Sequence, residues 1–315
     1  MSSHRTDWFY AARWGVATHY LGTPEQSAES WQAQVDAFDV VGLATQVASM
    51  GAGYLLFTLG QNSGHYCSPN AKYDEFTGIA PSKLSRRDLL LELADALALH
   101  GVALMAYLPS GGPAYDHLAC ERLGWEWGYE GGWPNGYQVL THKRLVHFQH
   151  KWEAVIREWS ERWGSKVRGW WFDGCYFPDD MYQFKEEPNF ASFAAAARSG
   201  NPDAIVAFNP GIEVTAFTPE EDYTAGETAD PGLIQPAGRF LEGEQLQVWS
   251  YLGQSWCQPP LRFSDEEAIA HTRRLLAGGA VVTWDVPIKP SGLLDEAALA
   301  QLQALGKALG PGPRD

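Results

Sequence analysis

The sequence predicts an α/β protein, specifically a (β/α)8 TIM-like barrel built as a single domain over residues 1–315. Short apolar segments alternate with longer amphipathic ones, the number of such pairs approaches eight, and no proline- or serine-rich linker divides the chain. The length of 315 residues, with 45% hydrophobic and 19% charged residues, is sufficient to bury one large core. These observations favour one barrel over two smaller domains.

The first half of the chain opens with an apolar segment, 13–20, that is typical of a buried strand. Residues 39–51 carry apolar side chains at helical spacing and stop at Gly51, as a helix with a glycine C-cap does. The elements expected next are a strand at 54–59, a helix at 85–101, a strand at 102–108 and a loop rich in glycine and tryptophan at 109–137.

The second half repeats the same alternation. The expected elements are a helix at 142–164, a strand at 169–173, a helix at 189–200, strands at 204–209 and 246–253, a helix at 265–279, a strand at 280–286 and a helix at 293–309. Proline, glycine and acidic residues dominate 210–245, so a further strand is expected there without a clear apolar run to mark it.

Composition excludes several functional classes. A net charge of −15 opposes broad binding of nucleic acid or anionic membranes, which depends on clustered Lys and Arg, and it favours a neutral or cationic small ligand. The four cysteines are far apart with no CxxC pair, so free thiols are expected rather than a zinc knuckle or a disulfide framework. No segment has the length of a signal peptide core or a membrane span, and we expect a cytoplasmic protein.

The candidate site residues stand where the expected strands end. In a parallel barrel the carboxyl ends of the strands carry the chemistry. Polar or aromatic residues found there are His19, Gln61, Asn62, Tyr107, Asp173 and Asn209, followed by the acidic stretch 218–227, Trp256 and Asp285. Two carboxylates at one mouth, with aromatic faces for sugar C–H surfaces and amides for hydroxyls, favour a glycosidase acting on a small carbohydrate.

Seven motifs in the same order and spacing make the chain similar to the catalytic domain of the α-L-fucosidase family of retaining glycoside hydrolases. The main ones are "RWGVATHYLG", "GWWFDG", "DYTAGE", "LGQSWC" and "GGAVVTWDVPIKPSGLL". The resemblance implies that Asp173 is the nucleophile and Glu227 the acid/base. No cofactor or metal is expected, and the residues expected to contact the sugar are His19, Gln61, Asn62, Tyr107, Trp171 and Trp256.

The chain departs from that family in the residues that read the sugar. Gln61 and Asn62 stand where the family has a His-His pair, Ser63 replaces an aspartate, and "FNPGIE" at 208–213 lacks an arginine. We also expect no counterpart of the family's C-terminal β-sandwich. Gln and Asn offer neutral donors and acceptors instead of titratable ones, so the identity of the sugar stays open.

Other interpretations stay open on the sequence alone. Asp173 could cap the turn at the following glycine, and Glu213 is a rival to Glu227 as acid/base. The chain could be a carbohydrate-binding barrel without catalysis, or a metal-dependent hydrolase using His19, His65 and Asp173. A homo-oligomer and a monomer are equally compatible with the sequence.

Overall fold

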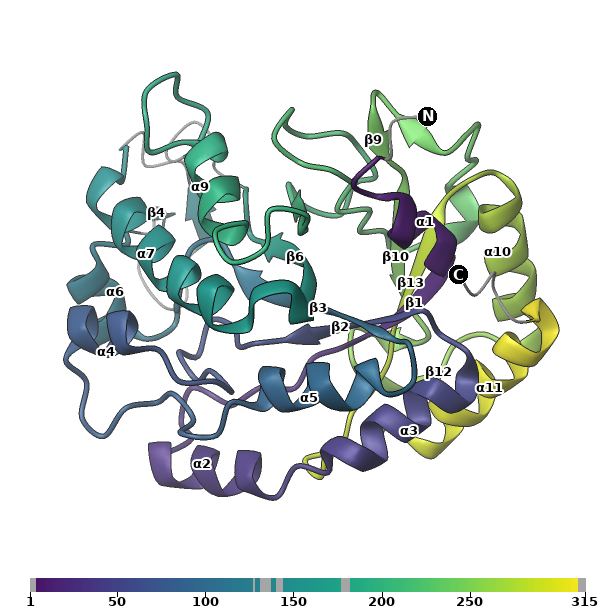
Figure 1. Cartoon of the computed structure of the whole chain (residues 1–315), viewed down its shortest axis with the longest axis horizontal. Helices are drawn as coiled ribbons and strands as arrows, with labels where there is room; N and C mark the ends of the chain where they lie inside the picture. The colour runs from purple at the N-terminus through teal and green to yellow at the C-terminus, as the bar shows by residue number, and fades with distance from the viewer. Residues whose placement is uncertain (1–3, 127, 131–136, 140–143, 177–181, 311–315) are drawn as a thin grey trace.

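Seven parallel strands form one curled sheet, a half-barrel, in the computed structural model of the chain (Figure 1). The structure describes residues 4–126, 128–130, 137–139, 144–176 and 182–310. In spatial order the strands are β10 (Gln247–Tyr251), β13 (Val281–Asp285), β1 (Trp14–Thr18), β2 (Tyr54–Thr58), β3 (Ala103–Pro109), β6 (Val167–Asp173) and β7 (Ile205–Phe208). This confirms the predicted barrel-like parallel sheet and each of these seven strands.

Helices cover the outer face of the sheet (Figure 1). They are α2 (Ala28–Asp36), α3 (Val40–Met50), α4 (Ala71–Thr77), α5 (Leu89–Ala98), α6 (His117–Leu123), α7 (Val146–Trp163), α9 (Phe190–Ala197), α10 (Asp265–Ala277) and α11 (Glu296–Leu309). Gly51 ends α3 in the left-handed conformation, as predicted. No helix in the described part of the chain is long and apolar enough to cross a membrane.

Some element boundaries differ from the prediction because capping residues set them. The helix expected at 85–101 begins only at Leu89, since the Asp88 side chain accepts a hydrogen bond from the Leu91 N–H and so caps it. The expected loop at 109–137 contains α6, which Asp116 caps in the same way. The short helices α2 and α4, together with α1 (Asp7–Ala12), were also missed.

One more barrel strand was expected within residues 210–245. No regular strand forms at 210–222. Instead, residues 222–228 lie parallel to β9 and β10 through two isolated bridges, Tyr223 with Gln245 of β9 and Glu227 with Trp249 in the middle of β10. On the other side, the Asp222 N–H donates to the Val206 carbonyl of β7. Residues 222–228 therefore bridge the two edge strands of the sheet without becoming a continuous strand.

Side chains alternate between the two faces of the sheet, which places the site residues on one of them. Trp170 and Phe172 of β6 pack outward against the helices, whereas Trp171 points inward with Tyr107 and Trp249. The inner face is closed at the amino ends of the strands by Phe9 of α1, which contacts the rings of Tyr54 and Tyr223 at 4.9 and 5.0 Å. Gly15 has no room for a side chain because the Tyr54 ring fills that position.

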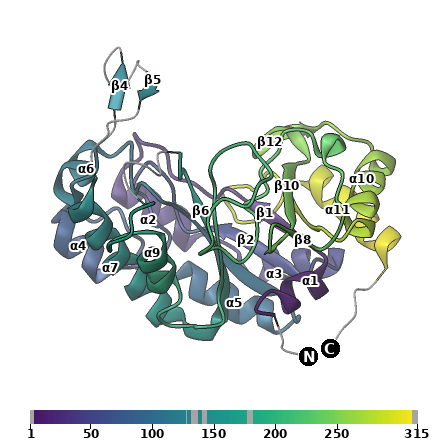
Figure 2. The same cartoon turned by 90° about the horizontal axis from the view of Figure 1, so that it is seen from above.

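Three short antiparallel pairs extend from the loops. They are β4 (Gly128–Glu130) with β5 (Tyr137–Val139), β8 (Phe240–Leu241) with β9 (Glu244–Gln245), and β11 (Gly253–Ser255) with β12 (Gln258–Leu261). The first pair projects away from the body beyond α6 (Figure 2). In the third pair, β11 and β12 are connected by a turn at Trp256 and Cys257. These two residues lie over the inner face at the carboxyl ends of the parallel strands.

Candidate active site

A cavity of about 490 Å³ opens at the carboxyl ends of the parallel strands. Its lining combines two acids, a histidine, two amides and several aromatic rings contributed by different strands and loops, namely His19, Gln61, Gln258, Tyr107, Trp171, Asp173, Tyr176, Glu227, Trp249 and Trp256, together with Leu21, Cys257 and Ile288. The volume suits a ligand of monosaccharide size. All the candidate contact residues predicted from the sequence line it except Asn62.

Asp173 ends β6 with its carboxylate held by neighbouring side chains. The Tyr107 hydroxyl donates to Oδ2 at 2.5 Å, and the Asn209 amide donates to Oδ1 at 2.9 Å. The Tyr176 hydroxyl lies 3.4 Å from Oδ1. Gly174 follows with φ of 78°, which lets the chain turn sharply away from the strand. The carboxylate is thus bonded across the cavity by other strands and loops, unlike a turn-capping aspartate bonded to its own backbone.

Glu227 faces Asp173 through a shared amide. The same Asn209 Nδ2 that donates to Asp173 also donates to Glu227 Oε2 at 2.5 Å. The two bonded carboxylate oxygens are therefore at most about 5.4 Å apart, the sum of those two hydrogen-bond lengths, and this upper limit is compatible with the separation of roughly 5–5.5 Å in retaining glycosidases. Asn209 follows β7, and Glu227 occupies the end of the bridging segment at 222–228.

The environment of Glu227 favours its protonated form. Burial and, next, the negative charge of Asp173 raise the pKa of Glu227 to about 7, although the hydrogen bond from Asn209 and the charge of His19 lower it. A carboxyl group with this pKa can give and take a proton near neutral pH. Glu213, the rival acid, is exposed and is not part of the cavity lining.

Gln61 and Asn62 lie side by side in the chain but in different surroundings. The Gln61 side chain donates to the Tyr107 hydroxyl at 2.6 Å, which in turn donates to Asp173. Asn62 accepts a hydrogen bond from the Tyr115 N–H through its main-chain carbonyl. Gln61 therefore takes part in a relay that reaches the carboxylate, whereas the Asn62 side chain is not part of the cavity lining.

Stacked and edge-on rings form one wall of the cavity. Trp171 stacks on Tyr107 with centroids 5.2 Å apart and meets Trp249 edge-on at 4.3 Å. Trp256 contacts Trp249 at 5.4 Å and Tyr251 at 4.8 Å. Such faces pack against the C–H surface of a ring-shaped ligand. Sequence reasoning missed Trp249 and Tyr176, although Trp249 lies on the inward-facing alternation of its strand.

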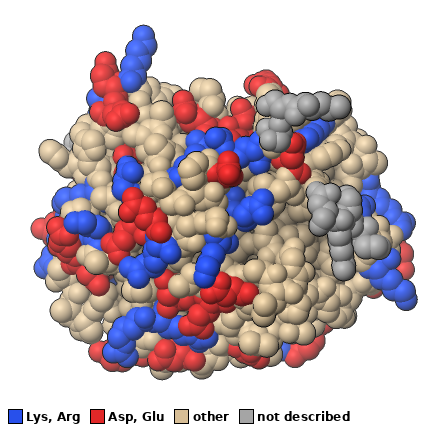
Figure 3. All heavy atoms as spheres, viewed as in Figure 1, with Lys and Arg blue, Asp and Glu red and all other residues tan. Residues whose placement is uncertain are grey.

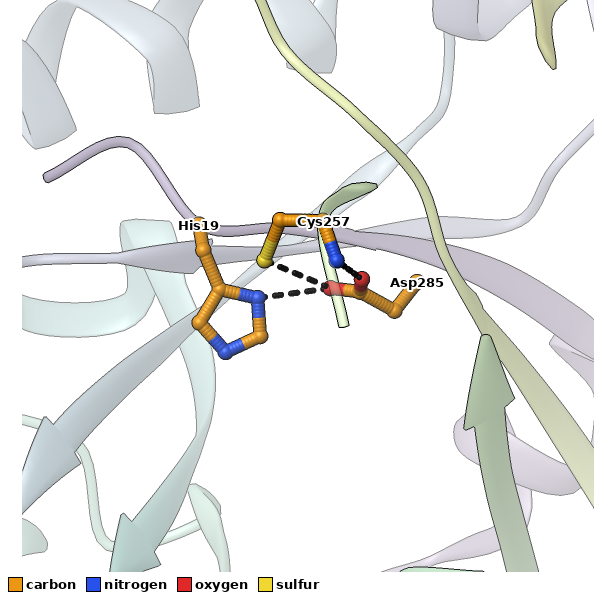
Figure 4. Close-up of side chains that lie close together, drawn as sticks. All are labelled: His19, Cys257 and Asp285. Atoms are coloured by element: carbon orange, nitrogen blue, oxygen red, sulfur yellow. Dashed lines mark hydrogen bonds and ion pairs between the residues drawn. The ribbon is translucent and has the colours of Figure 1, made fainter. Parts of the chain in front are cut away.

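His19 and Asp285 form a pair beside these rings (Figure 4). The His19 Nδ1 lies 2.6 Å from Asp285 Oδ2, and the Cys257 N–H donates to the other oxygen, Oδ1, at 2.6 Å. Burial lowers the pKa of His19, but the charge of Asp285, followed by the interaction with Cys257 and the hydrogen bond to Asp285, more than offsets it, so the pKa is raised well above its ordinary value.

The ligand set suggested by the metal-hydrolase interpretation does not converge. In the described residues, the group of histidine, cysteine and acidic side chains close enough to share an ion is His19, Cys257 and Asp285, which includes neither His65 nor Asp173. His65 is buried against Trp31, and its burial lowers its pKa to about 4.

On the face shown in Figure 3, basic side chains are interspersed with acidic ones.

No family model and no curated protein matches the sequence. Solved structures do match the fold. The endo-fucoidan hydrolase MfFcnA4 of glycoside hydrolase family 107 has a TM-score of 0.71 at 16% identity, covering 97% of this chain and 53% of its own. For the endo-fucoidan hydrolase P5AFcnA of the same family, the TM-score is 0.70 at 16% identity, with 99% and 95% covered.

An α-L-fucosidase of family GH29 from Bacteroides thetaiotaomicron matches with a TM-score of 0.66 at 15% identity, covering 98% of this chain and 73% of its own. The chain thus shares the fold of fucosidase and fucoidan hydrolase catalytic domains, as the motif resemblance predicted. It spans about half the length of the first of these structures, MfFcnA4.

Proposed function

We propose that the chain is a retaining glycoside hydrolase that releases a terminal α-L-fucosyl residue or a closely related sugar, with residues 1–315 acting as one catalytic barrel. The observation that carries this proposal is the pair of carboxylates, Asp173 and Glu227, bridged by one Asn209 amide at the wall of a cavity. The fold shared with an α-L-fucosidase and with endo-fucoidan hydrolases supports the choice of sugar.

Asp173 would act as the nucleophile. The hydrogen bonds from Tyr107 and Asn209 fix the carboxylate in one orientation and stabilise its charge, so that one oxygen can attack the anomeric carbon. The C–O bond to the leaving group breaks as the new bond to Asp173 forms, which gives a covalent glycosyl-enzyme.

Glu227 would supply the proton in the first step and remove one in the second. Its raised pKa leaves a substantial protonated fraction near neutral pH, so it can protonate the departing oxygen. Once Asp173 is consumed in the covalent bond, the negative charge that raised the Glu227 pKa is gone. Glu227 then becomes a better carboxylate base for the water that hydrolyses the intermediate.

The test is a panel of L- and D-configured 4-nitrophenyl glycosides, followed by trapping with a 2-fluoro sugar of the best substrate. We expect release from an L-fucose-configured substrate and a label on Asp173 in the digested protein. A label on another residue contradicts the assignment of the nucleophile.

A carbohydrate-binding barrel without turnover is the second candidate. It is favoured by Gln61, which stands in place of a histidine of the resembling family and donates its amide to Tyr107. Saturable sugar binding with no release from any glycoside of the panel would select this candidate.

A further inference from the structure

The buried carboxylate of Asp285 has no role in the mechanism described above, although it touches a residue of the cavity wall. Asp285 ends β13 and pairs in register with Ala17 of β1, so its side chain and that of His19, two residues further on, lie on the same inner face. The Asp285 side chain has no exposed area, whereas that of His19 is 10% exposed. A carboxylate this deeply buried needs partners for both of its oxygens.

Both oxygens of Asp285 are occupied by donors from separate elements. Oδ2 meets His19 Nδ1 at 2.6 Å, and Oδ1 accepts from the Cys257 N–H at 2.6 Å. Cys257 adopts a φ of 58°, a left-handed conformation that is uncommon for a residue other than glycine. The turn between β11 and β12 is therefore shaped so that its backbone reaches this carboxylate.

The His19 ring is also fixed on its faces and edges. It stacks on Trp249 with an interplanar angle of 13° and meets Tyr107 and Trp256 edge-on. Figure 4 shows Nε2 on the side of the ring turned away from Asp285 and Cys257. Within the residues that the structure describes, no hydrogen-bond partner meets Nε2, and His19 lines the cavity.

The same three side chains fit a metal ion poorly. An ion held by an imidazole nitrogen and a carboxylate oxygen at about 2.0–2.1 Å in tetrahedral geometry keeps those atoms about 3.3 Å apart. Nδ1 and Oδ2 are closer than this, at the distance of a charge-assisted hydrogen bond. The Cys257 Sγ lies 3.8 Å from Oδ2, as a weak thiol donor does.

We propose that Asp285 is a positioning residue of the sugar site, which orients His19 so that its Nε2–H is presented to the cavity as a fixed donor for an acceptor oxygen of the substrate. This inference rests on the proposed function. It specifies the group that the substrate must present to His19: a hydroxyl or ring oxygen of the sugar that accepts a hydrogen bond from an imidazolium.

The groups that face His19 agree with this role. Asp285 carries the stabilising negative charge, and Tyr107 and Cys257 are neutral near pH 7. Glu227 interacts favourably with a cationic ring only in its charged form, because its pKa is raised to about 7. Because His19 Nδ1 is hydrogen-bonded to Asp285, Nε2 is the ring nitrogen that can contact a ligand.

Asp285→Asn tests the proposal in two ways that a purely structural residue would not affect. First, we expect KM for the best aryl glycoside to rise at least about tenfold while kcat changes less than about threefold, because ground-state contact is lost. Secondly, the loss should vanish in a His19→Ala background, because Asp285 acts through His19. Asp295→Asn, which removes the same charge at the N-cap of α11, is the matched control and should leave both constants unchanged.

An NMR titration of the His19 imidazole nitrogens keeps this inference separate from the proposed function, because it needs no turnover. We expect the midpoint to fall by at least about one pH unit in Asp285→Asn, with Nδ1 losing its hydrogen-bond signature. An unchanged titration, additive kinetic effects in the double mutant, or a stoichiometric metal ion bound through His19 in the purified protein would overturn the proposal.

Discussion

Asp222 and Glu227 lie near the two ends of the short segment 222–228, and their surroundings differ. At the amino ends of the strands, Asp222 forms ion pairs with Arg5 and Arg198, each at 2.6 Å. At the carboxyl ends, Glu227 shares a neutral amide with Asp173 and faces a cavity. The first acid is neutralised by cations, whereas the second meets another acid.

A raised pKa occurs at both ends, so it does not by itself identify a site. Burial raises the pKa of Glu221, next to Asp222, to about 8, and burial followed by the charge of Asp222 raises that of Glu244 to about 7. Glu221 is enclosed by backbone N–H donors of Phe217 and Phe208 and is not part of the lining of the cavity that holds Asp173 and Glu227. The comparison teaches that a perturbed acid indicates function only where it also faces open space and a second reacting group.

The largest effect is expected from removing the nucleophile. Asp173→Ala should lower kcat by at least about 10⁴-fold, because no other carboxylate can reach the anomeric carbon from that position. Steady-state kinetics measure the loss, and azide added as an external nucleophile should restore release as the glycosyl azide. Asp222→Asn is the matched control at the other end of the segment, and activity per folded molecule should stay at the level of the unmodified chain. Near-normal turnover of Asp173→Ala would remove the basis of the mechanism.

Glu227→Gln should show a smaller loss that depends on the leaving group. We expect kcat/KM to fall about 10² to 10⁴-fold for alkyl glycosides, which need protonation, and far less for 4-nitrophenyl glycosides, which do not. Since Glu227 acts in its protonated form and its pKa is about 7, activity of the unmodified chain should decline as pH rises through that value. The variant should lack this alkaline limb; equal losses on both substrate types would assign the proton transfer elsewhere.

Asp222→Asn should affect stability rather than chemistry. The substitution removes the charge that pairs with Arg5 and Arg198 but keeps an acceptor for the Val206 N–H, so we expect unfolding to become easier by about 2 kcal/mol. Denaturant titration measures the change. A free energy of unfolding equal to that of the unmodified chain would mean that the two ion pairs add little beyond their desolvation cost.

The last effect is a change in the pH dependence of stability at Glu221, which does not involve the chemistry of the cavity. The folded chain holds the Glu221 proton to about pH 8 while the unfolded chain releases it near its ordinary pKa of 4.5, so stability falls as pH rises between these values. Glu221→Gln should remove that decline, which amounts to at most about 1.4 kcal/mol per pH unit. Unfolding curves compared at about pH 5.5 and about pH 7.5 measure it. The same slope in both proteins would place the responsible group elsewhere.

Much of the fold could be predicted because its signals are local. Apolar runs mark the strands, amphipathic spacing marks the longer helices, and Gly51 marks where α3 ends. The short helices escaped because they depend on capping and on packing against neighbours. The segment at 222–228 could not be predicted because its backbone hydrogen bonds are made with β7, β9 and β10, which are separated from it by loops.

The sequence by itself determined the order of the strands along the chain, the alternation of inward and outward side chains, and the place of Asp173 at the end of an apolar run. Only the tertiary structure decided that Asn209 joins Asp173 to Glu227 and that Asp285 meets His19. The physical reason is that strand order in space and the curl of the sheet set which strand ends face one another. Those contacts join residues up to 266 positions apart, which no local pattern encodes.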